Sequence, residues 1–159
     1  MTYSIVYSSK TGNTKMLADA ILQTLEEKDC MYCGKPDAQA LQADRIYVGF
    51  WTDKGRCNEE IAQFLKTIET QAVFLFGTAG FGQDPEYFSE ILFQTQKCLK
   101  NPNCVIGTYM CQGKMPMSVR HRYESMPNIA NKQKMLDNFD QALQHPNDQD
   151  LENLKRIIK

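Results

Sequence analysis

The stretch of sequence that decides the fold is Ser8-Ser9-Lys10-Thr11-Gly12-Asn13-Thr14. It follows the short apolar run at residues 3–8 and precedes a segment whose apolar residues recur at intervals of four, at Leu17, Ile21 and Leu25. These patterns predict a buried strand and then a helix that runs to about Lys28. At such a junction backbone N–H groups point along the helix axis, and the helix dipole adds partial positive charge.

The side chains of this stretch suit a terminal phosphate group. Ser9, Thr11 and Thr14 add hydroxyl donors, while Gly12 and Asn13 tolerate the left-handed backbone that an anion-binding nest requires. The stretch is neither the dinucleotide motif GxGxxG nor the triphosphate loop GxxxxGK[ST], and the missing Gly-Lys pair argues against ATP or GTP. The alternative is a polar strand-to-helix turn that only caps the helix.

Along the rest of the chain, short apolar runs alternate with segments of helical period, which is typical of βαβ units and a parallel sheet. Further strands are predicted at 30–33, 45–50, 72–78 and 105–110. Further helices are predicted at 59–69, from Asp84-Pro85 with an inner stripe that ends at Leu99, and after the cap His145-Pro146-Asn147. The Met-rich stretch 114–144 is predicted to be helical without assigned bounds. We expect a single α/β domain over residues 1–159.

Composition excludes several classes of protein. Apolar residues make up 42% and charged residues 23%, as in ordinary globular domains, and the net charge of −1 gives no field that attracts nucleic acid or an anionic membrane. The N-terminus leads directly into the first strand, and no apolar run approaches the length of a membrane span. We therefore expect a cytoplasmic protein, a monomer or weak dimer, whose six cysteines are reduced.

The residues 9–14 resemble the flavodoxin phosphate loop, [ST]-x-T-G-N-T. Two predicted loops, 49–55 and 76–82, follow the third and fourth strands, where that family contacts the flavin ring. Cys111-Gln112-Gly113-Lys114 and the closing segment 146–159 also resemble one branch of the family. The uninterrupted fifth strand resembles the short-chain form. The resemblance implies a flavodoxin-like doubly wound sheet of five parallel strands, in the order 2-1-3-4-5, with helices on both faces and FMN at the carboxyl ends of strands one, three and four.

The same resemblance implies three groups of FMN-binding residues. The phosphate group comprises Ser9, Lys10, Thr11, Gly12, Asn13 and Thr14; the ring groups comprise Trp51, Thr52, Asp53, Lys54 and Gly55, and Thr78, Ala79, Gly80, Phe81 and Gly82. Trp51 is expected to stack on the flavin, the alternative being a tryptophan packed on the rim of the core. Gly55 is expected to let a carbonyl turn towards the flavin or to serve as a plain turn glycine. Phe81 and Tyr87 both remain candidates for a second stacking residue.

Other clusters of reactive residues carry weaker signals. Cys30-Met31-Tyr32-Cys33 contains CxxC, which indicates a dithiol or half a zinc site, but no second CxxC exists and the thiols of an edge strand are the favoured interpretation. The stretch 111–114 is expected beside the flavin loops, as a wall of the site or a docking surface. Arg120-His121-Arg122 is a basic cluster that suits either a partner's acidic patch or plain solvent exposure.

Three functions follow from these patterns. The favoured one is an FMN electron carrier that supplies electrons to a partner reductase. The second is an enzyme that takes hydride from NAD(P)H and reduces a small acceptor such as a quinone, which requires an open nicotinamide pocket that Trp51 tends to block. The third is a flavin-free interaction module that uses the Met-rich stretch 110–135.

Overall fold

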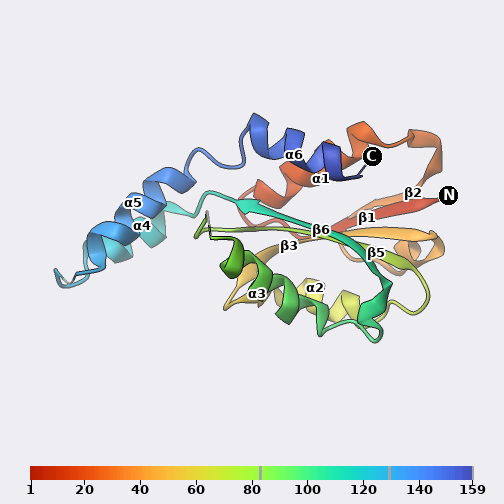
Figure 1. Cartoon of the computed structure of the whole chain (residues 1–159), viewed down its shortest axis with the longest axis horizontal. Helices are drawn as coiled ribbons and strands as arrows, with labels where there is room; N and C mark the ends of the chain where they lie inside the picture. Colours follow the sequence, from red (N-terminus) through yellow and green to blue (C-terminus); the bar gives the residue numbers. More distant parts are fainter. Residues whose placement is uncertain (83, 129, 159) are drawn as a thin grey trace.

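A parallel β-sheet forms the middle layer of the protein (Figure 1). In the computed structural model, which describes residues 1–82, 84–128 and 130–158, its strands are β1 (Tyr3–Tyr7), β2 (Cys30–Gly34), β3 (Arg45–Asp53), β5 (Ala72–Ala79) and β6 (Val105–Gln112). They pair in parallel in the order β2-β1-β3-β5-β6. Counted along these five strands, this is the predicted order 2-1-3-4-5, and the predicted fold class is confirmed.

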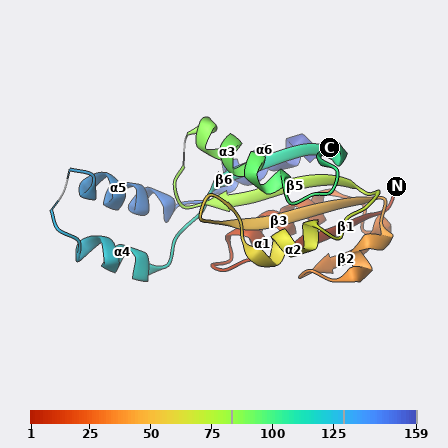
Figure 2. The ribbon, with the colours of Figure 1, turned by 90° about the horizontal axis from the view of Figure 1, so that it is seen from below.

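Helices cover both faces of the sheet (Figures 1 and 2). One face carries α1 (Asn13–Thr24) and α6 (Asp148–Ile158), and the other carries α2 (Glu59–Leu65) and α3 (Pro85–Gln96). Each face therefore has its own apolar core. The strand between them, β5, is buried from its second residue onward, as its lack of polar alternation predicts. No helix in the described residues is long and apolar enough to cross a membrane.

A helical hairpin projects beyond the carboxyl edge of the sheet (Figure 2). It consists of α4 (Met117–Glu124) and α5 (Lys132–Ala142), which lie in the stretch predicted to be helical without bounds. Hydrogen bonds join the helices: the Arg120 guanidinium donates to the two carboxylate oxygens of Asp140 at 3.0 and 3.1 Å, and the Lys132 ammonium donates to the Glu124 carbonyl at 2.9 Å. The hairpin lies beside the ends of the strands that carry the predicted site.

The first helix is shorter than predicted. It ends at Thr24 rather than near Lys28, and Leu25 is already extended. The chain needs the intervening residues to reverse direction before β2, and it does so through the 3-10 turn η1 (Glu27–Asp29). The spacing of the apolar residues does not indicate where the chain must reverse direction, so it did not predict this end of the helix.

The helices α2 and α3 also end early, at Leu65 and Gln96, although the apolar stripes were predicted to continue. The Ile68 N–H donates to the Leu65 carbonyl at 3.3 Å, and the Leu99 N–H donates to the Gln96 carbonyl at 3.0 Å. Both helices thus finish in tighter i→i+3 turns. Ile68 and Leu99 remain buried, so the stripes predict burial correctly and helix type incorrectly.

The prediction of a loop at 49–55 is wrong for its first part. Strand β3 continues to Asp53, turns at Lys54 (φ 53°) and Gly55 (φ 83°), and returns as the two-residue strand β4 (Arg56–Cys57), which pairs antiparallel with β3. Two consecutive positive φ angles are the signature of a tight hairpin turn. Trp51 therefore lies on a strand and not after one.

The predicted cap of the last helix is present. The Asp150 N–H donates to Asn147 Oδ1 at 3.0 Å, and the Asn147 N–H donates to Asp150 Oδ2 at 2.8 Å. This reciprocal pair satisfies amides at the start of α6. The acidic first turn and the basic last turn also match the helix dipole, as expected.

Two glycines in the centre of the sheet lie under aromatic rings of the neighbouring strand. Gly49 pairs with Phe76, and Phe50 pairs with Gly77. A Cβ atom on Gly49 would lie 2.3 Å from the Phe76 ring, and one on Gly77 would lie 2.4 Å from the Phe50 ring. Both rings are buried, so neither can move aside without disturbing the core.

Gly49→Ala is therefore expected to lower the free energy of unfolding by about 1–3 kcal/mol, the usual cost of overpacking a core. Urea denaturation followed by circular dichroism measures this change. Ser89→Ala, at an exposed position of α3, is the control and should change stability by less than about 0.5 kcal/mol. Equal stability of the Gly49→Ala and wild-type proteins would contradict the close contact.

Candidate functional site

The loop between β1 and α1 forms the floor of the candidate site. Gly12 has a φ angle of 88°, a left-handed conformation that glycine adopts without steric strain, and α1 begins at Asn13. Ser9 Oγ accepts a hydrogen bond from the Lys15 N–H at 3.2 Å. This bond ties the loop to the first turn of the helix and leaves the Ser9 hydroxyl hydrogen free to donate.

The backbone N–H groups from Lys10 to Thr14 have no hydrogen-bond partner in the described part of the chain. The backbone bonds of α1 begin with the Met16 N–H, which donates to the Gly12 carbonyl at 3.1 Å. Unpaired amides at a helix N-terminus carry the positive end of the helix dipole. A row of such donors makes an anion-binding concavity.

The side chains of this loop point in different directions. Thr14 is buried, and its hydroxyl donates to the Phe50 carbonyl at 3.1 Å, so Thr14 offers its backbone N–H rather than its side chain to a ligand. Asn13 is only 6% exposed. Its Nδ2 donates to the Lys114 carbonyl at 2.8 Å, while its Oδ1 is buried without a partner in the described residues.

Residues 113–116, here called the strap, connect β6 to α4 and cross the site. The Lys114 carbonyl accepts a second bond, from Thr11 Oγ1 at 3.3 Å, and the Gly113 N–H donates to the Ala79 carbonyl at 2.9 Å. A Cβ atom on Gly113 would lie 2.5 Å from Asn13 Nδ2, so this close approach requires glycine. The strap thus joins the β1–α1 loop to the end of β5, and the stretch 111–114 lies beside the predicted ring loops as expected.

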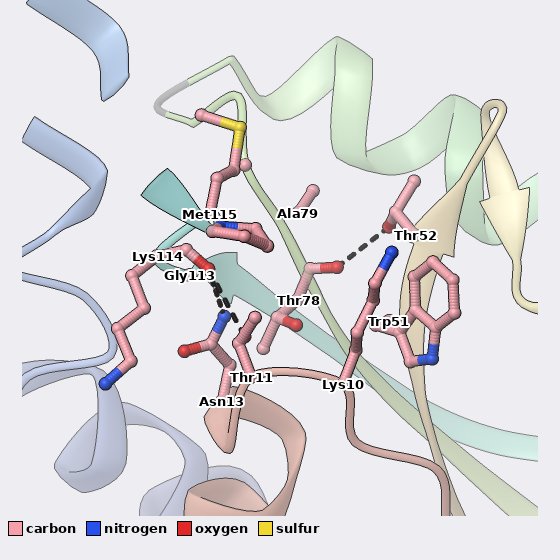
Figure 3. A pocket seen from close by; sticks show the side chains of 12 residues that line it. Lys10, Thr11, Asn13, Trp51, Thr52, Thr78, Ala79, Gly113, Lys114 and Met115 are labelled. Atoms are coloured by element: carbon pink, nitrogen blue, oxygen red, sulfur yellow. Dashed lines mark hydrogen bonds between the residues drawn. The ribbon is translucent and has the colours of Figure 1, made fainter. Parts of the chain in front are cut away.

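A pocket of about 140 Å³ opens between the β1–α1 loop, the ends of β3 and β5, and the strap (Figure 3). It is lined by Lys10, Thr11, Asn13, Trp51, Thr52, Thr78, Ala79, Gly80, Gly113, Lys114, Met115 and Pro116. All three predicted groups of site residues therefore meet here. The predicted residues outside the lining are Ser9, Gly12, Thr14, Asp53, Lys54, Gly55, Phe81 and Gly82.

Trp51 is held at the rim of the pocket by its own backbone. Its N–H donates to Asn58 Oδ1 at 3.3 Å, and its carbonyl accepts from the Asn58 N–H at 3.0 Å. The Lys10 ammonium lies 4.9 Å from the centroid of the indole ring, and Figure 3 shows the Lys10 side chain beside that ring. Next along the strand, Thr52 Oγ1 donates to the Thr78 carbonyl at 2.8 Å. The half-buried indole thus has a fixed place at the mouth of the pocket.

The loop after β5 is oriented by two amide side chains. The Gly80 carbonyl accepts from Gln112 Nε2 and from Asn138 Nδ2, both at 3.0 Å. Because C=O and N–H point in opposite directions in a trans peptide, the Phe81 N–H faces away from these two donors. A Cβ atom on Gly82 would lie 2.5 Å from the Gln112 side chain, which explains the glycine. Helix α5 thereby fixes the direction of a backbone donor near the pocket.

The remaining ring-group residues lie at the edges of the site. Asp53, Lys54 and Gly55 are exposed at the tip of the β3–β4 turn. Phe81 is 42% exposed, and its ring meets the Tyr87 ring edge-on, with centroids 6.3 Å apart. The two candidates for a second stacking residue therefore contact each other.

The six cysteines have different environments. A bulge at Met31 pairs Cys30 with Tyr3 and Cys33 with Ile5, which places both thiols on one face of the edge strand β2. Cys33 is exposed, and partial desolvation, with smaller contributions from Cys30 and Asp19, raises the pKa of its thiol. Burial raises the pKa of Cys57 to about 12 and also raises the pKa of the Cys111 thiol, so neither is an activated nucleophile.

No cluster of three or more potential metal ligands occurs among the described residues.

A family model described as Flavodoxin domain matches residues 4–159. The chain belongs to the flavodoxin family. Its relatives within this family include the flavodoxin-like domain-containing protein BilS of Clostridium symbiosum (strain WAL-14163), 38% identical over 173 residues that cover 95% of this chain and 90% of the relative. The BilS protein of Clostridioides difficile (strain CD3) is 29% identical over 155 residues, with 92% and 88% coverage. A solved short-chain flavodoxin is 18% identical, with 90% and 96% coverage and a TM-score of 0.53.

Membership of the flavodoxin family implies a flavin cofactor, and the donors of this site fit the phosphate of such a group. The unpaired amides from Lys10 to Thr14 and the free hydroxyl hydrogen of Ser9 are all donors, as a phosphate requires. The buried Asn13 Oδ1 is an acceptor that still lacks a donor. These polar groups have no partner among the described residues, so this end of the site suits an anionic group.

Sequence reasoning missed several residues that shape the site. Asn58, Asn138, Met115 and Pro116 were not predicted, and Lys114 was quoted only as part of the stretch 111–114. The local signal for Asn58 is its position three residues after the Lys54-Gly55 turn. The strap and Asn138 carry no local signal, because they meet the site through contacts between residues far apart in the chain.

The accessibility of the cysteine thiols tests the burial of Cys57 and Cys111 and the exposure of Cys33. Iodoacetamide is expected to alkylate Cys33 first in the native protein, because Cys33 is the exposed cysteine. The rate should keep rising above the pH range of ordinary thiols, because the pKa of Cys33 is raised and less thiolate is present at a given pH. Peptide mass spectrometry identifies the site, with Cys33→Ser as the control. Faster modification of Cys57 or Cys111 would show that the core is packed differently.

Proposed function

We propose that this protein binds one FMN non-covalently and carries electrons through it to a partner reductase. The single observation that carries the proposal is the row of unpaired backbone N–H groups from Lys10 to Thr14. The row lies at the N-terminus of α1, at the carboxyl ends of parallel strands, where open α/β sheets bind their ligands. Each helix-end contribution is about 0.3–2 kcal/mol, so several donors together can hold a phosphate.

The ring end of the site supports a flavin at the surface of the protein. The pocket volume of about 140 Å³ lies below the ~300–1,000 Å³ of pockets that enclose a whole ligand. A flavin ring beside Trp51 would therefore remain partly exposed. An indole can add about 0.5–1.5 kcal/mol of stacking beyond the burial of its area. Exposure of the ring edge suits transfer of electrons to another protein.

The same small pocket favours a carrier over a stand-alone NAD(P)H reductase. FMN supplies the redox chemistry when it is bound. The protein's residues would anchor the phosphate through the β1–α1 loop, position the ring beside Trp51, and direct the Phe81 N–H through the fixed Gly80 carbonyl. The strap borders the same pocket, since residues 113–116 line it, and this leaves little room for a nicotinamide beside the flavin.

Purified protein tests this proposal in two steps. A yellow chromophore that is released by heat and identified as FMN, at about one per chain, supports the cofactor assignment. Anaerobic addition of NADPH or NADH alone should then leave the yellow colour, and bleaching should require a reductase. Rapid bleaching by the nicotinamide alone would favour the enzyme, and failure to bind FMN would favour the flavin-free module.

Two variants separate phosphate binding from folding. Ser9→Ala removes the loop hydroxyl whose hydrogen is free to donate and is expected to raise the Kd for FMN about tenfold, because a hydrogen bond to a charged group contributes about 1.5–3 kcal/mol. Thr14→Val removes a buried hydroxyl that donates to Phe50 and should lower stability. Fluorescence quenching of FMN measures the Kd, and urea denaturation measures stability. An unchanged Kd in the first variant would refute the role of the Ser9 hydroxyl.

A further inference from the structure

We infer that the ammonium group of Lys114 binds the terminal phosphate of the ligand and, at the same time, Asn13 Oδ1. This inference rests on the proposed function, because it assigns one more residue to the same phosphate. It adds a full positive charge, supplied by the strap, to a site otherwise built from backbone amides and hydroxyls.

The β1–α1 loop contains a buried acceptor without a donor among the described residues. Asn13 Oδ1 is buried and has no donor among the described residues, although Nδ2 of the same amide is bound to the Lys114 carbonyl at 2.8 Å. A buried acceptor without a partner costs about 1–3 kcal/mol. A phosphate oxygen cannot satisfy it, because both atoms only accept. A group with several donors is therefore needed between the amide oxygen and the phosphate.

Lys114 is the residue placed to supply those donors. Its backbone is fixed against the loop, since its carbonyl accepts from Asn13 and Thr11 and its N–H donates to the His145 carbonyl at 3.0 Å. Its side chain is exposed and extends from the strap past Asn13 (Figure 3). An ammonium group carries three donors and no acceptor. It can serve Asn13 Oδ1 and a phosphate oxygen together.

The other lysines near the loop are engaged elsewhere. Lys15 forms an ion pair with Asp19 at 2.9 Å, and the Lys10 ammonium lies over the Trp51 ring. The Lys114 ammonium makes no hydrogen bond or ion pair with any described residue. A phosphate monoester carries a charge of about −1.5 to −2 near neutral pH, so it attracts an unpaired cation on the neighbouring strap.

Binding of FMN and of riboflavin, which lacks the phosphate, separates this role from a structural one. Lys114→Met keeps the length of the side chain and removes the charge. It should raise the Kd for FMN by about 5- to 20-fold. This loss is smaller than for a buried hydrogen bond to a charged group, because solvent at the open site screens the charge. The Kd for riboflavin should stay within about twofold. Lys114→Arg should restore most of the FMN affinity, and raising the salt concentration should weaken FMN binding less in Lys114→Met than in wild type.

Lys134→Met, which removes an exposed charge on α5, is the matched control and should leave both affinities unchanged. Equal losses of FMN and riboflavin affinity in Lys114→Met would overturn the inference in favour of a role in folding of the strap. An unchanged FMN affinity would overturn it as well. If the wild-type protein itself does not bind FMN, the proposed function fails; if it binds FMN and Lys114→Met binds equally well, only the assignment of Lys114 fails.

Discussion

The backbone amides at the junction of β1 and α1 are the constraint on which the rest of the site depends. Helix formation leaves the first N–H groups of α1 without partners, and Gly12, in its left-handed conformation, turns the chain so that the preceding amides are also unpaired. No described residue accepts from these donors, whereas the hydroxyl of Thr14 donates to the Phe50 carbonyl. An anion supplied from outside is the partner that this arrangement lacks.

Close approach of backbones holds the surrounding segments in place. Gly113 brings the strap against Asn13, and Gly82 brings the loop after β5 against Gln112. Gln112 and Asn138 then fix the Gly80 carbonyl, so the helical hairpin α4–α5 is connected to the ring end of the site. The projecting hairpin and the loop after β5 are thereby joined by hydrogen bonds, which under the proposed function gives a partner that touches the hairpin a physical connection to the flavin.

The sequence predicted those features that arise from local physics. The strands of the sheet and their order followed from apolar runs and from the family motif at 9–14, and the cap at Asn147 followed from side-chain chemistry within one turn. The β3–β4 hairpin was not predicted, because the polar residues at 52–55 are typical of a loop. Lys54-Gly55 nevertheless suits a two-residue hairpin turn. The contact between Asn13 and Lys114 joins residues 101 positions apart. No local sequence pattern indicates such a contact, so the position of the strap over the loop could not be predicted from the sequence.

Amide proton chemical shifts of the β1–α1 loop test the central claim most directly. Titration of ¹⁵N-labelled protein with FMN should move the amide protons of residues 10–14 downfield, as charge-assisted hydrogen bonds to a phosphate form. Riboflavin should leave these signals nearly unchanged while it shifts signals around Trp51. Large FMN-induced shifts elsewhere, with the signals of residues 10–14 unmoved, would contradict the account.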